Sequence, residues 1–207
     1  MNWLRRWERV EAPVGAPAPP VAGSARVERQ TRGISTLLAG VSRERMHSVL
    51  DLGGATNSSL QVYRGFARWV RFEDLLSVAD SEEELDAALA SIPHHRERPY
   101  DVLLAWNLLD RVAPHQRPRV VARLAEVSAP DARLFLAIEA GSERPQHPLR
   151  FGLVDNEHMW FEPVEGFPPA WPPLLPAELE RLIEPFVVSR AFTTRVGFRE
   201  YVATKRG

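Results

Sequence analysis

The residues best suited to chemistry stand between positions 47 and 60, where an acidic side chain and two glycines follow a short apolar run. The run Val49–Leu52 is typical of a buried strand, and Thr56 with the polar residues after it can begin a helix. Glycine lets the backbone approach a ligand, and the first turn of a helix offers unpaired N–H groups. The order strand, turn, helix therefore predicts a ligand site, with Asp51 just before the turn.

Two further strand ends carry polar or aromatic side chains. Residues 69–72 read as a second strand, which ends at Glu73 and Asp74. The apolar run 100–112 is almost continuous, as a central parallel strand buried on both faces must be, and Trp106 with Asn107 stands where that strand ends. We expect a crevice at one rim of a wound sheet, flanked by the carboxylates of Asp51 and Glu73.

Residues 49–57 resemble the first motif of class I S-adenosylmethionine-dependent methyltransferases, a strand followed by Asp/Glu-x-Gly-x-Gly-x-Gly. Gly53 matches the first motif glycine, Ala55 and Asn57 take the second and third places, and Gly54 fills a variable one. Residues 100–112 are similar to the fourth motif of the family, a Tyr/Phe-Asp-hydrophobic strand followed by a Leu-acidic-basic-hydrophobic turn.

This resemblance implies S-adenosylmethionine as the cofactor, with an acid after the second strand holding the two ribose hydroxyls. A carboxylate can accept two hydrogen bonds from a diol, so Glu73 is the first candidate and Asp74 the second. Trp106 and Asn107 would lie beside the sulfonium and the entering substrate. The implied cofactor-binding residues are Asp51, Gly53, Gly54, Ala55, Asn57, Glu73, Asp74, Trp106 and Asn107. In the competing interpretations Trp106 is a core aromatic and Glu73 an ordinary polar residue at a strand end.

The implied reaction is displacement at the methyl carbon of the cofactor by an O, N, S or carbon nucleophile. This chemistry mainly requires alignment and exclusion of water, so no residue is assigned as catalytic. His147 and His158 are possible general bases by their location alone. The chain lacks the Asn/Asp-Pro-Pro-Tyr signature of enzymes that methylate DNA amines, which favours a small-molecule or other non-DNA acceptor.

The expected fold is α/β, a Rossmann-like doubly wound and mostly parallel sheet with a C-terminal antiparallel hairpin. The third strand of the family is expected to be missing or reduced to Leu75 and Leu76. Residues 27–46 have the apolar spacing of a helix that leads into the first strand. The other expected helices are 58–67, 81–92, 114–128 and 175–184, and the expected later strands lie within 129–138, 186–192 and 198–204.

The predicted organisation has two parts. Residues 1–26 combine an amphipathic helix, residues 2–10, with a proline-rich tether; this helix could bind a protein partner or a membrane surface, or fold back on its own domain. Residues 27–207 form the methyltransferase-like domain. Its aromatic and proline-rich insertion, residues 141–176, is either a substrate-facing lid or an irregular loop packed across a sheet edge.

Composition narrows the functional classes further. The formal net charge of -1, from 26 basic and 27 acidic residues in 207, predicts no general attraction to nucleic acid. The absence of cysteine excludes disulfides, thiolate zinc sites and cysteine nucleophiles. No apolar run is long enough to span a membrane and no secretory signal is evident, so we expect a cytoplasmic protein. His94 and His95 read as a surface loop, and no metal site is expected.

Two alternatives to an active methyltransferase remain at this point. One is a catalytically inactive methyltransferase-like interaction module, recruited through the helix at residues 2–10. The other is a dinucleotide-dependent oxidoreductase, which is disfavoured because Gly-x-Gly-x-x-Gly is absent and Asp51 precedes the glycines.

Overall fold

The computed structural model describes residues 26–41, 46–79, 81–94, 98–140, 147–165, 171–172, 174–194 and 197–207. The predicted helix at residues 2–10 lies outside these ranges, as do nearly all of its tether and His95.

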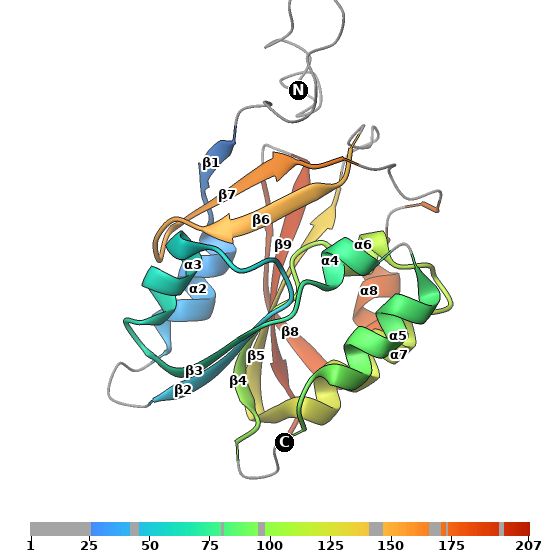
Figure 1. Cartoon of the computed structure of the whole chain (residues 1–207), viewed down its shortest axis with the longest axis horizontal. Helices are drawn as coiled ribbons and strands as arrows, with labels where there is room; N and C mark the ends of the chain where they lie inside the picture. The colour runs from blue at the N-terminus through green and yellow to red at the C-terminus, as the bar shows by residue number, and fades with distance from the viewer. Residues whose placement is uncertain are drawn as a thin grey trace, which may run out of the picture.

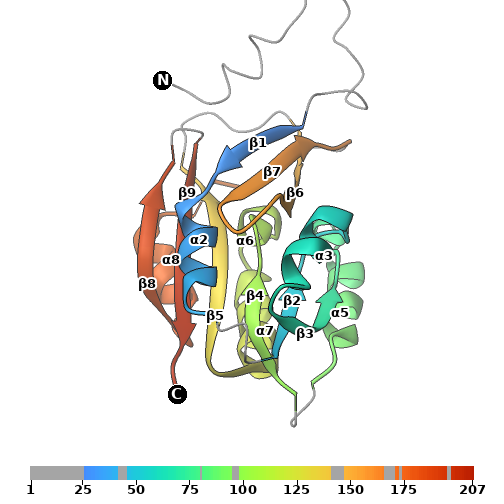
Figure 2. The same cartoon turned by 90° about the vertical axis from the view of Figure 1, so that its left-hand side faces the viewer.

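Six strands form the main sheet, in the order β3-β2-β4-β5-β9-β8 (Figures 1 and 2). The first four run parallel to one another, whereas β9 pairs antiparallel with both β5 and β8. The bounds of these strands are β2 His47–Asp51, β3 Ala67–Phe72, β4 Tyr100–Leu104, β5 Ser128–Glu139, β8 Phe186–Thr193 and β9 Phe198–Lys205. The predicted α/β fold with a C-terminal antiparallel hairpin is confirmed.

Helices cover both faces of the main sheet (Figure 1). One face carries α2 and α3, and the other carries α5, α7 and α8. The helix bounds are α2 Arg32–Ala39, α3 Asn57–Tyr63, α4 Leu75–Val78, α5 Glu82–Ser91, α6 Leu108–Arg111, α7 Arg117–Val127 and α8 Pro176–Leu182. Because both faces are covered, β2 and β4 are buried along nearly their whole length, which explains their continuous apolar sequences.

The third strand expected of the family is absent from the main sheet as described. After β3 the chain forms α4, which contains Leu75 and Leu76, then α5, and returns as β4 at the centre of the sheet. No described strand pairs with the outer edge of β3, so this strand ends the sheet (Figure 2).

A second, three-stranded antiparallel sheet has the order β1-β7-β6. It corrects the helix expected from residue 27 and bears on the two alternatives for residues 141–176. Its strands are β1 Val27–Gln30, β6 Leu149–Leu153 and β7 His158–Pro163. Residues 27–30 are therefore a strand and not the start of a helix, because they pair with β7. The insertion at 141–176 is likewise no irregular loop over residues 149–163, where it forms a regular hairpin. We call β1, β6 and β7 the cap sheet.

The cap sheet lies across one end of the main sheet, above α3 and the ends of β2 and β4 (Figures 1 and 2). Its residue Phe151 stacks on Trp106, which follows β4, with ring centroids 5.6 Å apart. The backbone N–H of Leu153 donates to the Ser59 hydroxyl in α3 at 2.9 Å. These contacts place the cap sheet over the rim of the main sheet at which the sequence predicts a crevice.

Candidate functional site

Asp51 ends β2 and is 1% exposed. Its Oδ1 accepts hydrogen bonds from the Trp106 indole N–H at 2.6 Å and from the Gly53 backbone N–H at 3.0 Å. Its Oδ2 accepts from the Tyr63 hydroxyl at 2.6 Å. Both carboxylate oxygens are therefore bonded to groups of the protein itself.

Burial dominates the ionisation of this carboxyl group. Desolvation raises the pKa of Asp51 to about 6, although the hydrogen bonds from Tyr63, Trp106 and Gly53 lower it. Burial, together with the negative charge of Asp51, also raises the pKa of Tyr63 well above its usual value. Near neutral pH, Tyr63 is thus a donor and Asp51 an acceptor.

Trp106 fills the space between the ends of β2 and β4. It follows β4, is fully buried and has a φ of 47°, a conformation that bulky residues rarely adopt. Its ring stacks on Phe151 at an interplanar angle of 10° and meets Phe135 edge-on at 5.7 Å. A Cβ placed on Gly53 would lie 2.9 Å from the indole nitrogen, so the ring lies directly against the turn.

The position of Trp106 matters because of the topology. The chain winds from β2 outward to β3 and then crosses to β4 on the other side, so the order of strands reverses between β2 and β4. Ligands of open α/β sheets bind at such a switch point, outside the carboxyl ends of the strands. The hydrogen bond from Trp106 to Asp51 bridges the two strands that flank this point.

The turn after β2 forms without left-handed residues. Ala55 and Asn57 are exposed and neither has a positive φ, so their side chains cause no backbone strain at the places where the motif has glycine. Gly54 is half-buried, and a Cβ added there would lie 3.1 Å from an Asp74 carboxylate oxygen.

The first residues of α3 are bonded within the protein. Thr56 caps the helix, because its hydroxyl accepts from the Ser59 backbone N–H at 3.1 Å. The Ser59 hydroxyl accepts from Leu153, as described above, and the Ser58 hydroxyl accepts from the Trp160 indole N–H at 3.2 Å. Two serine hydroxyls at the start of α3 thus hold the cap sheet.

Glu73 and Asp74 lie beside Asp51 at the rim, since the Glu73 backbone N–H donates to the Asp51 carbonyl at 2.9 Å. The Glu73 carboxylate forms an ion pair with Arg71, whose Nε donates to it at 3.0 Å. Asp74 caps α4 by accepting from the Ser77 backbone N–H at 3.2 Å, and burial raises its pKa.

The remaining candidates lie in three different settings. Asn107 is 1% exposed, and its side-chain oxygen has no hydrogen-bond partner among the described residues. His158 begins β7, and its Nδ1 lies 2.9 Å from Asp155 Oδ1 in a partly exposed pair. His147 precedes β6, and its Nδ1 is buried with no partner in the described part of the chain. No cluster of described His, Asp or Glu side chains could hold a metal ion.

Sequence reasoning missed the parts played by Tyr63 and Phe151. Tyr63 was not singled out, although a buried tyrosine hydroxyl needs a polar partner and the sequence places three acids, Asp51, Glu73 and Asp74, within 12 residues of it. Phe151 gave no signal of its own, because nothing in the sequence links the insertion to the residues after β4.

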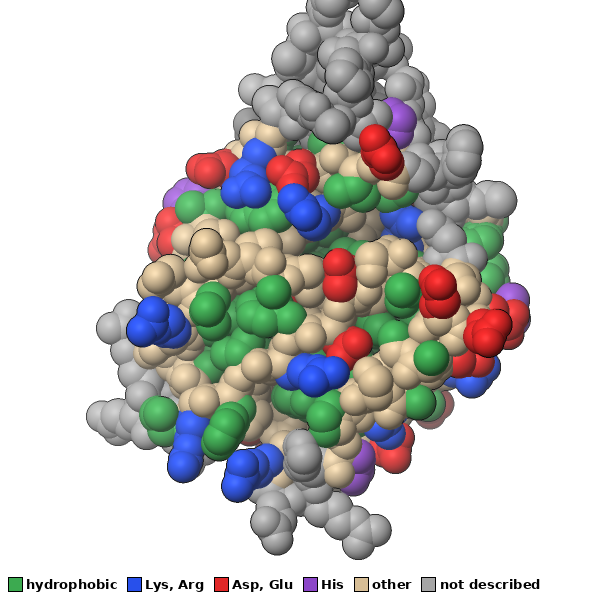
Figure 3. Space-filling model, in the orientation of Figure 1, with side chains coloured by type: hydrophobic (Ala, Val, Ile, Leu, Met, Phe, Trp, Pro, Cys, Tyr) green, Lys and Arg blue, Asp and Glu red, His purple; other side chains and the backbone are tan. Residues whose placement is uncertain are grey.

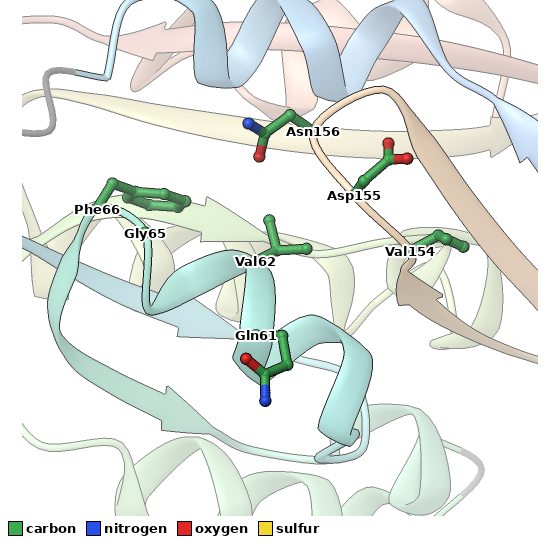
Figure 4. A pocket seen from close by; sticks show the side chains of 7 residues that line it. All are labelled: Gln61, Val62, Gly65, Phe66, Val154, Asp155 and Asn156. Carbon is green, nitrogen blue, oxygen red and sulfur yellow. The ribbon is translucent and has the colours of Figure 1, made fainter.

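A cavity of about 320 Å³ lies away from the predicted crevice, between α3 and the turn that joins β6 to β7 (Figure 4). It is open to solvent, and none of its lining residues was a predicted site residue. The lining consists of Gln61, Val62, Gly65, Phe66, Val154, Asp155 and Asn156.

No family model matches this sequence, and a search of curated proteins finds no match either. Among solved structures, the chain is similar to the 1,6-didemethyltoxoflavin-N1-methyltransferase of Burkholderia thailandensis, solved with bound 1,6-didemethyltoxoflavin and S-adenosylhomocysteine. The TM-score is 0.51 and the identity 16%, over 85% of this chain and 78% of that chain.

A second similar structure is the N-methyltransferase NodS of Bradyrhizobium japonicum WM9, with a TM-score of 0.52 and 10% identity. This match covers 84% of our chain and 94% of that chain. No described helix is long and apolar enough to cross a membrane. The sheet order, the helices on both faces and these two likenesses agree, and the chain has the fold of class I S-adenosylmethionine-dependent methyltransferases.

Proposed function

We infer that this protein uses the methyltransferase fold as a binding module, and that Trp106 takes the place of S-adenosylmethionine at the switch point. The observation that carries this proposal is the fully buried indole that lies against Gly53, donates to Asp51 and stacks on Phe151. On this proposal, S-adenosylmethionine could bind only if the Trp106 indole moved away from Gly53 and Asp51.

Other groups that the resemblance assigns to the cofactor also have partners in the protein. Arg71 binds the carboxylate of Glu73, the residue expected to hold the ribose hydroxyls. Leu153 and Trp160 of the cap sheet bond to the first residues of α3. An adenosyl ligand would need to displace several of these contacts at once.

The energetic cost of that displacement decides the affinity. Removing a buried tryptophan from its packing costs roughly 3–5 kcal/mol, the range found when such a side chain is truncated. A micromolar ligand gains about 8 kcal/mol on binding, and each 1.4 kcal/mol changes the affinity tenfold. A site that would otherwise be micromolar is thereby weakened to about 0.1 mM or worse.

Calorimetric titration with S-adenosylmethionine and S-adenosylhomocysteine tests the proposal. For the full chain we expect no saturable heat corresponding to a Kd tighter than about 0.1 mM. The matched variant Trp106→Gly opens the space beside Gly53, and a glycine also suits the positive φ at this position. Micromolar binding by the unmodified chain, lost on Asp51→Ala, would overturn the proposal.

The second candidate is an active methyltransferase that acts on a small-molecule or other non-DNA acceptor and opens this crevice to bind S-adenosylmethionine. Two observations favour it: the strained φ of Trp106 and the unpartnered, buried side-chain oxygen of Asn107. Because Trp106 must leave Phe151 in this scheme, the titration would change the tryptophan fluorescence, and the change would vanish in Trp106→Phe.

Recruitment through residues 2–10 remains part of the module proposal. Deleting residues 1–22 should abolish association with a protein partner or a lipid vesicle while leaving the unfolding temperature unchanged. Unaltered association after this deletion would remove the helix from the proposal.

A further inference from the structure

The outer edge of β3 is unpaired in the described structure, because no third strand follows it. An edge strand presents a row of backbone N–H and C=O groups that can pair with another extended chain. In Figure 2, β3 lies at one margin of the main sheet and β8 at the other.

The backbone of β3 shows which peptide groups are available. The Glu73 N–H points toward β2, because it donates to the Asp51 carbonyl. Peptide groups alternate in direction along a strand, so those of Val70 and Phe72 point away from β2. The irregular register at the beginning of the β2–β3 pair does not interrupt this alternation after Trp69.

The side chains along this edge are basic and aromatic. Trp69 is 48% exposed, and the guanidinium groups of Arg68 and Arg98 lie 5.9 and 5.1 Å from the centroid of its ring. Arg71, also exposed, pairs with Glu73. Among the described residues on this strand and around Trp69, three arginines accompany one glutamate, Glu73. Figure 3 shows basic side chains beside hydrophobic ones on the face that carries β3.

The charge of this edge decides whether a second copy of β3 or a strand of another protein is the better partner for it. Two copies of β3 related by a twofold axis would pair antiparallel, with the same face of each sheet continuing into the other. Such pairing would gather Arg71 and Arg98 of both copies on one face of the joined sheet. An acidic strand offers the opposite charge at the same positions, and opposite-charge pairs across strands are favourable.

We propose that the open edge of β3 is a docking site for an extended acidic segment of a partner protein, which adds a strand beside Val70 and Phe72. The backbone of the segment bonds to β3, and its alternate Asp or Glu side chains meet Arg71 and Arg98 around the exposed Trp69. This proposal is independent of cofactor binding, since neither Asp51 nor Trp106 takes part in it.

The test uses a labelled, capped peptide of four Thr-Glu repeats with the full-length protein. We expect saturable binding by fluorescence anisotropy and slower hydrogen exchange at the amides of Val70 and Phe72. A matched peptide methylated at every backbone nitrogen keeps the charges but cannot donate to the strand, so its affinity should fall at least tenfold. Equal binding by the methylated peptide, or no binding of the first peptide at 1 mM, would overturn the proposal.

Variants of the protein give an independent readout. Val70→Pro removes an outward N–H and leaves the hydrogen bonds to β2, so peptide affinity should fall about tenfold, whereas Val70→Thr keeps the N–H and the affinity. Arg98→Glu should also weaken binding, and the loss should shrink in high salt. A dimer in sedimentation without peptide, with β3 amides protected, would show that a second copy occupies the edge and would refute the acidic partner.

Discussion

The ionisation of Asp51 reports the burial of its carboxyl group, because desolvation raises the pKa more than the hydrogen bonds from Tyr63, Trp106 and Gly53 lower it. Its pKa is about 6 in the folded protein against 3.8 ordinarily. A raised carboxyl pKa stabilises the fold fully below pH 3.8, and this stabilisation is lost as the pH rises through about 6. The difference of about 2 pKa units corresponds to about 3 kcal/mol.

Asp51→Asn should therefore change how stability depends on pH. As the pH rises from 4 to 7.5, the unmodified protein should lose about 3 kcal/mol of unfolding free energy that the variant does not lose, because asparagine does not titrate. Urea unfolding at several pH values measures this difference. Asp110, whose pKa burial raises to about 7, is present in both proteins and cancels. If the unfolding free energies of the two proteins changed in parallel with pH, the raised pKa of Asp51 would be contradicted.

Trp106→Phe tests the hydrogen bond separately from the packing. The variant keeps an aromatic ring against Phe151 but leaves Asp51 without one donor, which should cost about 1–3 kcal/mol of unfolding free energy. Trp69→Phe is the matched control on an exposed site and should change stability by less than about 0.5 kcal/mol. Equal effects in chemical denaturation would mean that the indole N–H contributes nothing specific.

Among the elements, the cap sheet was the least predictable. The apolar spacing of residues 27–46 fits a helix, and α2 does form at Arg32–Ala39. Residues 27–30 adopt a strand because Val27 pairs with Phe161, a partner that local periodicity cannot reveal. By contrast, β2 and β4 were predictable, because strands buried on both faces have continuous apolar sequences.

The candidate site shows the same division between local and distant information. The sequence placed Asp51 and Trp106 at the ends of neighbouring strands, since each follows an apolar run. It did not predict that they bond to each other, because the direction of a side chain depends on packing, here against Phe151 of the cap sheet. Local sequence therefore indicated where a site belongs in this fold but not what fills it.

Gly152 in β6 allows the cap sheet to pack. A Cβ at this position would lie 2.5 Å from the Trp160 ring, so Gly152→Ala should lower the unfolding free energy by about 1–3 kcal/mol and loosen the contact with α3. Gly65→Ala is the control, because its nearest non-neighbouring atom would be a carbonyl oxygen at 3.3 Å. Thermal unfolding compares the two variants, and equal midpoints would contradict the tight packing assigned to Gly152.

At the scale of the whole molecule, the missing third strand and the added cap sheet have different consequences. Without a third strand, the main sheet ends at β3, where Trp69 and the arginines are exposed. The cap sheet, in contrast, covers a part of the main sheet, namely the rim at which ligands of this fold bind. The protein therefore combines the core strand order of the methyltransferase fold with an open sheet edge at β3 and a covered rim above β2 and β4.

The pairing of β1 with β7 also constrains how the protein is made. During synthesis β1 leaves the ribosome among the first folded elements, but its partner strand emerges only after β2, β4 and β5 have been completed. Until then the cap sheet cannot cover Trp106 and the start of α3, so the nascent parallel core exposes an aromatic surface. A chaperone that holds unfinished chains should therefore bind a fragment that ends at residue 140 more tightly than one that ends at residue 165, although both lack the β8–β9 hairpin.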